Sequence, residues 1–309
     1  MKNHLKNFIA AIILLFVLIV FAAGCKTPPP APAPEPEPPK PYASLKFNSP
    51  EAKEPTLINL GFTLEVFNPR SEIIGFVIDE WATVVNGARV SPGSSIKMTV
   101  PGPNAAKYAF NVAPGTEVSP GTAKIPIGLE LDVNSLNTAG VQLKDDFTVV
   151  LTLNLIYNSS PNTPARIQVT ETAVFPYIRE PVFSITAIAI LKAELINTRF
   201  RVTMQIDNPN IFPVDLSSFN YELFGNGLLW ADGSERNILS VPAKTSIRAN
   251  LFLLMNFINM KRDLLDQIIR LEDVNYRFAG DVLVNTGIEY LPRFKSEFDL
   301  SGYSQVLEN

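Results

Sequence analysis

The chain has 309 residues, of which 26 are basic and 30 acidic, so its formal net charge is −4. This acidic balance gives no electrostatic attraction for nucleic acid. The chain holds one histidine, His4, and one cysteine, Cys25, so disulfide bonds within the chain are excluded and the fold must rest on hydrophobic burial.

The first 24 residues have the layout of an export signal. Lys2 and Lys6 precede an apolar stretch over residues 8–23, and small residues then lead to Cys25. This arrangement resembles a bacterial lipoprotein signal, although Ala22 stands where that family usually has leucine. The resemblance implies a signal peptide over residues 1–24, cleavage before Cys25, and acylation of Cys25.

A retained transmembrane helix is the alternative for this segment. About 20 apolar residues are needed to cross a bilayer, and residues 8–23 supply fewer before Gly24 and Lys26. In either case we expect the remaining chain to be tethered to a membrane at its start. Lys26 is not the aspartate that favours inner-membrane retention in Gram-negative lipoproteins, so we expect the outer membrane of a bacterial cell envelope.

Cleavage would change the chemistry available to the protein. It removes Lys2, Lys6 and His4, so the charge becomes 24 − 30 = −6, and acylation consumes the only thiol. Ser-His-Asp, Cys-His and histidine-ligated metal sites are then excluded. The adjacent acids Asp79-Glu80, Asp145-Asp146 and Glu272-Asp273 point in different directions on a strand or helix, so we interpret them as solvated surface groups and expect no catalytic, cofactor or metal site.

Residues 25–41 form a proline-rich linker, because nine of the 14 residues from Pro28 to Pro41 are proline. Such a sequence favours polyproline II at about 3.1 Å per residue, which gives a spacer of roughly 40 Å. A docking site for a proline-binding module is the alternative.

Beyond the linker, the chain repeats a strand pattern at an offset of 140 residues. Apolar residues alternate up to Asn68-Pro69 and again up to Asn208-Pro209, and both segments read as half-buried strands that end at an Asn-Pro turn. At the same offset, Asn86-Gly87 matches Asn226-Gly227, and each dipeptide predicts a type I′ hairpin turn. The repeat predicts two domains, at residues 42–181 and 182–305.

The similarity resumes after a gap, where Leu129 and Leu131 align with Leu251 and Leu253 at an offset of 122. The first domain would then carry 140 − 122 = 18 extra residues within 91–120. We interpret this insertion as an enlarged hairpin or a surface loop, and such a loop is a candidate binding element.

After Asn256 the apolar period changes, and residues 257–271 are predicted to form a helix capped by Asn256. The matching residues 135–144 contain Gly140 and predict one or two helical turns. Each half closes with alternating strands. The expected fold is therefore mainly β: two tandem antiparallel β-sandwich domains of the fibronectin III or immunoglobulin-like type, each with one short helix.

The strand ending in Asn208-Pro209-Asn210, the Asn-Gly hairpin, the helix after Asn256 and the final strand pair together resemble the late embryogenesis abundant type 2 family. Its repeat is also called the water stress and hypersensitive response domain. The resemblance is clear over residues 184–302 and weaker over 42–181, where Arg70 replaces the second asparagine of the motif. It implies a seven-stranded sandwich, no cofactor, no catalytic residues and an association with desiccation stress.

Two functions follow as expectations. The first is a non-catalytic, membrane-anchored lipoprotein with a structural or protective role. The second is a module that binds a lipid or an envelope protein through the 91–120 loop or an apolar groove. The apolar residues that would form this groove are Ile185, Ile188, Ile190 and Leu251 to Leu254. Such dense apolar runs more often belong to a hydrophobic core. A hydrolase built from scattered acids is a third, weaker alternative.

Overall fold

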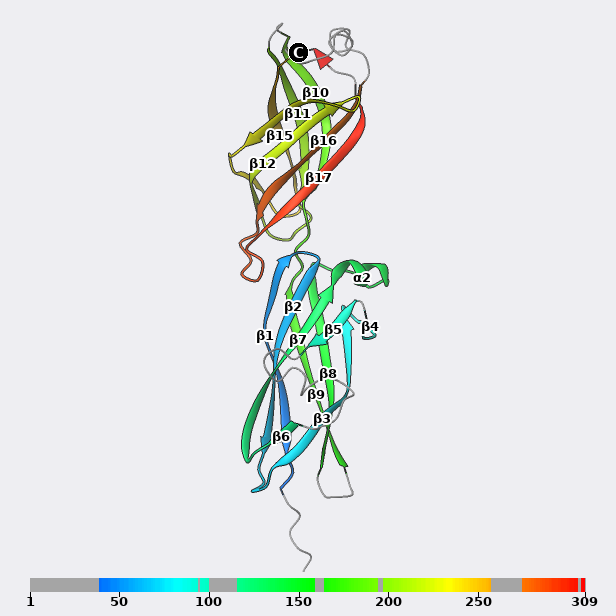
Figure 1. Ribbon diagram of the computed structural model, residues 1–309, viewed down its shortest axis with the longest axis vertical. Coiled ribbons are helices and arrows are strands. Elements are labelled where there is room, and N and C mark those ends of the chain that lie inside the picture. Colours follow the sequence, from blue (N-terminus) through cyan, green and yellow to red (C-terminus); the bar gives the residue numbers. More distant parts are fainter. Residues whose placement is uncertain are drawn as a thin grey trace, which may run out of the picture. The chain divides into compact units, whose positions relative to one another are not determined.

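The computed structural model describes residues 39–93, 95–99, 116–158, 164–193, 197–256, 274–304 and 307–308. The described chain is mainly β and its sheets are antiparallel, with one two-residue parallel pairing (Figure 1). The predicted signal peptide, Cys25, most of the proline-rich linker and the predicted helix 257–271 lie outside the described residues. Among the helices of the described residues, none is long and apolar enough to cross a membrane.

The first half of the described chain forms two sheets, with strand orders β1-β2-β7-β5 and β4-β3-β8-β9, and β6 pairs with β3. The strands are β1 (Tyr42–Glu54), β2 (Leu57–Asn68), β3 (Ile74–Val85), β4 (Ala88–Val90), β5 (Ile96–Thr99), β6 (Thr116–Val118), β7 (Gly121–Asp132), β8 (Asp146–Asn158) and β9 (Pro164–Pro176).

The second half also forms two sheets, with strand orders β15-β11-β10-β18 and β13-β12-β16-β17, and β14 pairs with β12. Its strands are β10 (Val182–Ala193), β11 (Asn197–Asp207), β12 (Val214–Gly225), β13 (Leu228–Glu235), β14 (Leu239–Val241), β15 (Ser246–Asn256), β16 (Val274–Asn285), β17 (Arg293–Ser304) and β18 (Leu307–Glu308).

The two halves share one pairing scheme. β1-β2-β7 corresponds to β10-β11-β15, and β4-β3-β8-β9 corresponds to β13-β12-β16-β17. The short strands correspond as well, since Ile74 pairs with Val118 and Val214 pairs with Val241. The described residues hold more strands per half than the seven that the family resemblance implies, because the short strands add to both sheets.

The strand register corrects one sequence prediction. Leu64 pairs with Ile125, and its counterpart Met204 pairs with Ala249, so β7 and β15 are related by 249 − 125 = 124 residues and not by 122. The first half therefore carries 140 − 124 = 16 extra residues. A shift of two residues keeps every side chain on the same face of a strand, so apolar alternation alone does not distinguish the two offsets.

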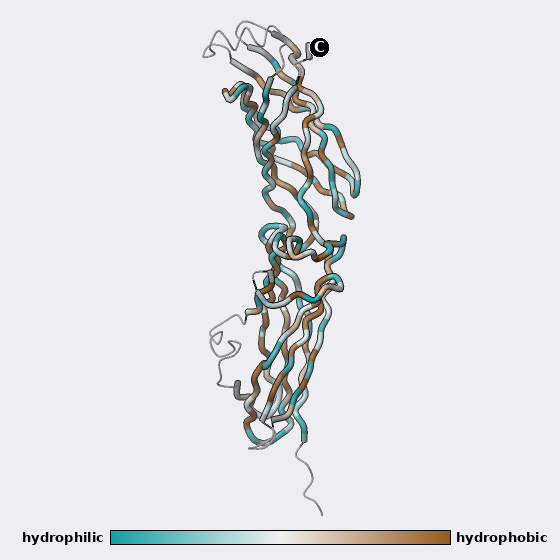
Figure 2. Tube along the Cα trace, turned by 90° about the vertical axis from the view of Figure 1, so that its right-hand side faces the viewer, coloured by the Kyte–Doolittle hydropathy of each residue, from teal (hydrophilic) through white to brown (hydrophobic). Residues whose placement is uncertain are grey.

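Each half has its own apolar core. One cluster joins Leu60 and Leu64 of β2 to Val149 and Leu153 of β8, and these side chains are fully buried. A second cluster joins residues of both sheets of the second half, including Phe200, Val202, Leu223 and Phe278. Apolar and polar residues alternate along the strands, which Figure 2 shows as alternating brown and teal segments. The period-2 pattern in the sequence thus reports directly which face is buried.

The short helix α2 (Val133–Thr138) follows β7 in the first half. Asp132 caps it by accepting a hydrogen bond from the backbone N–H of Ser135, which satisfies one of the donors at the helix start. The helix begins two residues earlier than the predicted segment 135–144 and ends before Gly140, whose φ of 81° suits glycine. It buries Val133 and Leu136 against the core.

Candidate functional site at the junction of the two halves

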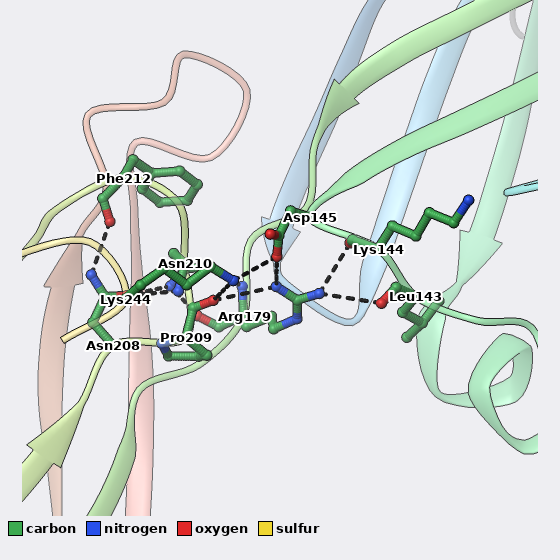
Figure 3. A network of polar contacts seen from close by, with 9 residues as sticks. All are labelled: Leu143, Lys144, Asp145, Arg179, Asn208, Pro209, Asn210, Phe212 and Lys244. Atoms are coloured by element: carbon green, nitrogen blue, oxygen red, sulfur yellow. Dashed lines mark hydrogen bonds and ion pairs between the residues drawn. The ribbon is translucent and has the colours of Figure 1, made fainter. Parts of the chain in front are cut away.

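The described chain passes from the first half to the second through residues 177–181, and Asn210 holds this segment. Its Oδ1 accepts a hydrogen bond from the backbone N–H of Arg179 at 2.7 Å, and its Nδ2 donates to the carbonyl of Arg179 at 2.9 Å (Figure 3). One buried amide thus satisfies both backbone groups of one linker residue. The second asparagine of the Asn-Pro-Asn motif is therefore the residue that fixes the linker.

The side chain of Arg179 reaches back to the first half. Its Nη1 donates to Asp145 Oδ1 at 2.7 Å, and its Nη2 donates to the carbonyls of Lys144 at 3.0 Å and Leu143 at 3.3 Å. The guanidinium carbon lies 4.6 Å from the centre of the Tyr177 ring. This planar, five-donor group is suited to several acceptors at once. Arg179 therefore connects the loop before β8 to the linker.

Lys244 adds a second cation from the second half. Its Nζ donates to Asp145 Oδ1 at 2.7 Å and to the carbonyl of Pro209 at 2.8 Å, a carbonyl that also accepts from Arg179 at 3.3 Å. The lysine backbone has a φ of 53°, which is uncommon for a residue with a side chain, and its N–H donates to the carbonyl of Asn210. Asp145 thus receives charged donors from the linker and from the second half.

These donors hold the pKa of the Asp145 carboxyl below its ordinary value. The hydrogen bond from Lys244 is the largest cause, and the hydrogen bond from Arg179 follows. The carboxylate is partly exposed, with 42% of its side-chain surface accessible, so solvent and salt screen this cluster. We name Asp145, Arg179, Asn210 and Lys244 the junction network.

Tyr290 forms an apolar part of the same junction. Its hydroxyl donates to the carbonyl of Pro176 at 2.6 Å, and its carbonyl accepts from the backbone N–H of Ala52 at 3.1 Å. Its ring contacts Phe175 edge to face, with ring centres 5.7 Å apart. Burial raises the pKa of the Tyr290 hydroxyl well above its ordinary value. Tyr290 thus belongs to the second half in sequence, and both its backbone carbonyl and its side chain contact residues of the first half.

The predicted Asn-Pro turns have the same internal structure. Asn68 Nδ2 donates to the carbonyls of Glu72 and Val118, and Asn208 Nδ2 donates to those of Phe212, Val241 and Pro242. In each turn the Oδ1 accepts from the backbone N–H two residues later. Both asparagines are buried. Each side chain therefore joins the turn after one strand to the short strand β6 or β14. Pro69 directly follows the last residue of β2, and Pro209 lies two residues after the end of β11.

The predicted Asn-Gly turns lie between β3 and β4 and between β12 and β13. Asn86 and Gly87 have φ values of 49° and 88°, and Asn226 and Gly227 have values of 50° and 80°. Positive φ at both central residues is the condition for a type I′ turn. Asn86 also bonds outside its hairpin, because its Oδ1 accepts from Thr148 N–H and its Nδ2 donates to the Gln142 carbonyl.

The adjacent acids Asp79 and Glu80 bond to neighbouring side chains. Asp79 lies 3.7 Å from Arg166, and Glu80 accepts a hydrogen bond from Asn154 at 3.5 Å. Both acids line a depression of about 610 Å³ that residues of β3, β8 and β9 also line. Asp145 belongs to the junction network, and Glu272 and Asp273 lie outside the described residues. Within the described ranges, no group of three or more His, Cys, Asp or Glu side chains is placed to hold a metal ion.

Sequence analysis missed Arg179, Lys244 and the junction role of Asp145. Arg179 lies in a short linker without periodicity, and Lys244 contacts Asp145 across 99 residues of sequence. The one signal present was Asn210, which completes an Asn-Pro-Asn motif in the second half only. Asparagine at this position bonds both backbone groups of Arg179, because its amide both donates and accepts.

Residues 203–294 match a family model described as "Late embryogenesis abundant protein", the type 2 family. This match confirms the family resemblance over residues 203–294, from within β11 to the start of β17. The family is associated with water stress. No curated protein sequence is significantly similar to the chain.

Three solved structures share a distant likeness with the chain. A protein from Archaeoglobus fulgidus has 15% identity and a TM-score of 0.28, with 42% of this chain and 98% of that chain covered. A glycosyl hydrolase family 2 member from Bacteroides cellulosilyticus has 9% identity and a TM-score of 0.26, with 80% of this chain and 29% of that chain covered. A calcium-binding mutant of Bacteroides uniformis β-glucuronidase 2 has 7% identity and a TM-score of 0.22, and the alignment spans 79% of this chain and 26% of that enzyme.

Proposed function

We propose that the chain is a non-catalytic lipoprotein of the bacterial cell envelope, in which two tandem β-sandwiches of the late embryogenesis abundant type 2 kind are held near a membrane. The observation that carries this proposal is the common pairing scheme of the two halves, one of which matches the family model. In each half, both sheets contribute to one buried cluster, which is the expected core of a sandwich. The proposed domains are residues 42–181 and 182–305.

The anchor is supported by the amino-terminal sequence. Two lysines, an apolar stretch and Gly24-Cys25 follow one another as in a lipoprotein signal. A single acyl chain gives only reversible membrane binding, so the proposed anchor needs the several chains that lipoprotein maturation attaches to one cysteine. The proline-rich residues 28–41 then act as a spacer between the bilayer and the folded halves. Lys26 favours the outer membrane.

The absence of catalysis is supported by the inventory of titratable groups. Once residues 1–24 are removed and Cys25 is acylated, no histidine and no free thiol remain in the sequence. The described acids discussed above bond to arginine, lysine or amide groups. We therefore propose a structural or protective role during drying, in line with the stress association of the family.

A strain that lacks the gene tests this role. Survival after drying should fall in the deletion strain, should return with the wild-type gene, and should not return with Cys25→Ser if membrane attachment is required. Equal survival of the deletion strain and the wild type under drying and osmotic shock would remove the protective role. Membrane fractionation of the same strains reports the anchor separately, because Cys25→Ser should release the protein from membranes.

A further inference from the structure

One sheet face in the second half differs from the rest of the acidic protein. On β11 and β15, alternate residues point into the core, including Phe200, Val202, Leu251 and Leu253. The opposite face carries Arg199, Arg201, Arg248, Phe252 and Leu254, and we name these five residues the arginine face. Arg199 lies opposite Leu254 and Arg201 lies opposite Phe252 in the register. β10, β11 and β15 are neighbours in this sheet (Figure 1).

The two apolar side chains of this face are exposed. Phe252 has 54% and Leu254 has 56% of its surface accessible, whereas Leu251 and Leu253 beside them are buried. The dense apolar run that sequence analysis assigned mostly to the core is therefore divided between the core and the surface. Two exposed residues of this size on neighbouring positions form an apolar patch that burial against another surface would stabilise.

The three arginines of the face have no carboxylate within ion-pair distance among the described residues. Arg201 also has a buried Nε without a hydrogen-bond acceptor in the described part of the chain. A planar guanidinium is suited to bidentate bonding of phosphate or carboxylate oxygens. Among the described residues, the face thus presents arginine donors that have no carboxylate partner, next to exposed apolar side chains.

The first half provides an internal comparison for this face. The positions of Arg201 and Phe252 correspond by register to Gly61 and Gly128, and those of Arg199 and Leu254 correspond to Asn59 and Glu130. The same fold therefore forms without arginines or exposed apolar residues at these sites.

Two cations on the first-half face are paired with carboxylates. Lys124, the counterpart of Arg248, lies 3.1 Å from Glu65, and Lys97 lies 3.5 Å from Glu130. The scaffold does not require the composition of the arginine face, so that composition indicates a partner.

We propose that the arginine face binds the surface of an anionic phospholipid bilayer. Arginine donors match the phosphate oxygens of lipid headgroups, while Phe252 and Leu254 match the boundary between headgroups and acyl chains. The chain as a whole has a net charge of −4, so general attraction to an anionic surface is absent and the binding must come from this local group. This surface goes beyond the proposed function and does not depend on acylation of Cys25.

Photo-crosslinking in the full chain tests this assignment. A benzophenone amino acid replaces Leu254, and the full-length protein is reconstituted in phosphatidylcholine vesicles. These vesicles are mixed with a second population that does or does not contain phosphatidylglycerol. After irradiation, mass spectrometry of the tryptic peptide 249–261, or of peptide 245–261 in a variant that lacks Arg248, identifies the adduct. We expect phosphatidylglycerol adducts at position 254, and none at position 130 in the control protein with benzophenone at Glu130.

Charge variants complete the experiment. Each arginine contributes roughly a factor of five to binding at an anionic surface, so replacing Arg199, Arg201 and Arg248 by alanine should lower the adduct yield by about two orders of magnitude. Lys124→Ala removes a cation at the matched position of the first half and should leave the yield unchanged. An unchanged circular dichroism spectrum and melting temperature show that each variant is folded.

Other outcomes overturn the proposal. Equal adduct yields with and without phosphatidylglycerol would show that the face does not recognise anionic lipid. Adducts to a second protein molecule and none to lipid would assign the face to an acidic protein surface. These outcomes are distinct from a failure of the proposed function, because every comparison is made between proteins with the same state of Cys25.

Discussion

Replacing Asn208 by alanine should destabilise the second half more than a typical surface substitution does. Asn208 is 2% exposed, and its amide nitrogen donates to the carbonyls of Phe212, Val241 and Pro242 at 2.9–3.1 Å. Its Oδ1 accepts from the backbone N–H and from the side chain of Asn210. Alanine removes all of these bonds, so the carbonyls of Phe212 and Val241 lose this donor and the Asn210 N–H loses its acceptor, while the Pro242 carbonyl keeps a bond from Thr245 Oγ1.

The magnitude follows from this count. The amide has two protons, so its three carbonyl contacts count as two donated hydrogen bonds. Together with the two accepted bonds they make four interactions, and each contributes about 1 kcal/mol net to stability. We therefore expect the free energy of unfolding to fall by about 4 kcal/mol, which is a large part of the total for a domain of this size. Asn208→Asp keeps the shape but replaces the amide protons with a carboxylate oxygen that faces the same carbonyls. It should be at least as destabilising.

Urea unfolding followed by far-ultraviolet circular dichroism measures this difference. Asn68→Ala is the matched variant in the first half, where the amide donates to two carbonyls, and it should lower the stability of the transition that belongs to that half. A loss below about 1 kcal/mol for Asn208→Ala would refute the reasoning, because it would mean that the turn keeps its geometry without the amide.

Three further substitutions test the junction and the core. Asp145→Asn should lower the urea midpoint near neutral pH. Hydrogen bonds from Lys244 and Arg179 hold the pKa of Asp145 below its ordinary value of 3.8, so the difference from wild type should shrink as pH falls below that value. A difference that stays constant with pH would contradict the ion pairing. Tyr290→Phe removes a hydroxyl whose pKa burial raises above its ordinary value of 10.0. The urea midpoint of the wild type should therefore fall more steeply than that of the variant as pH rises past 10.0. Parallel pH profiles would argue against burial of the hydroxyl. Gly225→Ala places a methyl group on the ring atoms of buried Trp230 and should cost about 1–3 kcal/mol with a change in tryptophan fluorescence, whereas Gly93→Ala, which meets open space, should be neutral.

Much of the secondary structure could be predicted because alternation is a local property. The ends of β2 at Asn68 and of β11 at Asp207, just before Asn208-Pro209, and the positive φ at Gly140 follow from residues within a few positions of each other. The offset between β7 and β15 could not be predicted, because an even shift leaves the buried face unchanged. Register is set by hydrogen bonds between strands, which a single sequence does not display.

The junction network and the arginine face were beyond sequence reasoning for a different reason. Arg179, Asp145 and Lys244 meet only after both halves have folded, and no spacing rule connects them. The run Leu251 to Leu254 reads as uniformly apolar, yet the strand places every second residue on the outer face. At the corresponding register positions of the first half, Asn59, Gly61, Gly128 and Glu130 stand where this face has Arg199, Arg201, Phe252 and Leu254.

The intact mass of the mature protein, purified from membranes, tests the proposed anchor most directly. The account predicts a chain that begins at Cys25 and carries the added mass of acyl chains, and Cys25→Ser should abolish that mass. A mature protein that retains residues 1–24 without acylation, or one that begins at Cys25 with an unmodified thiol, would contradict it.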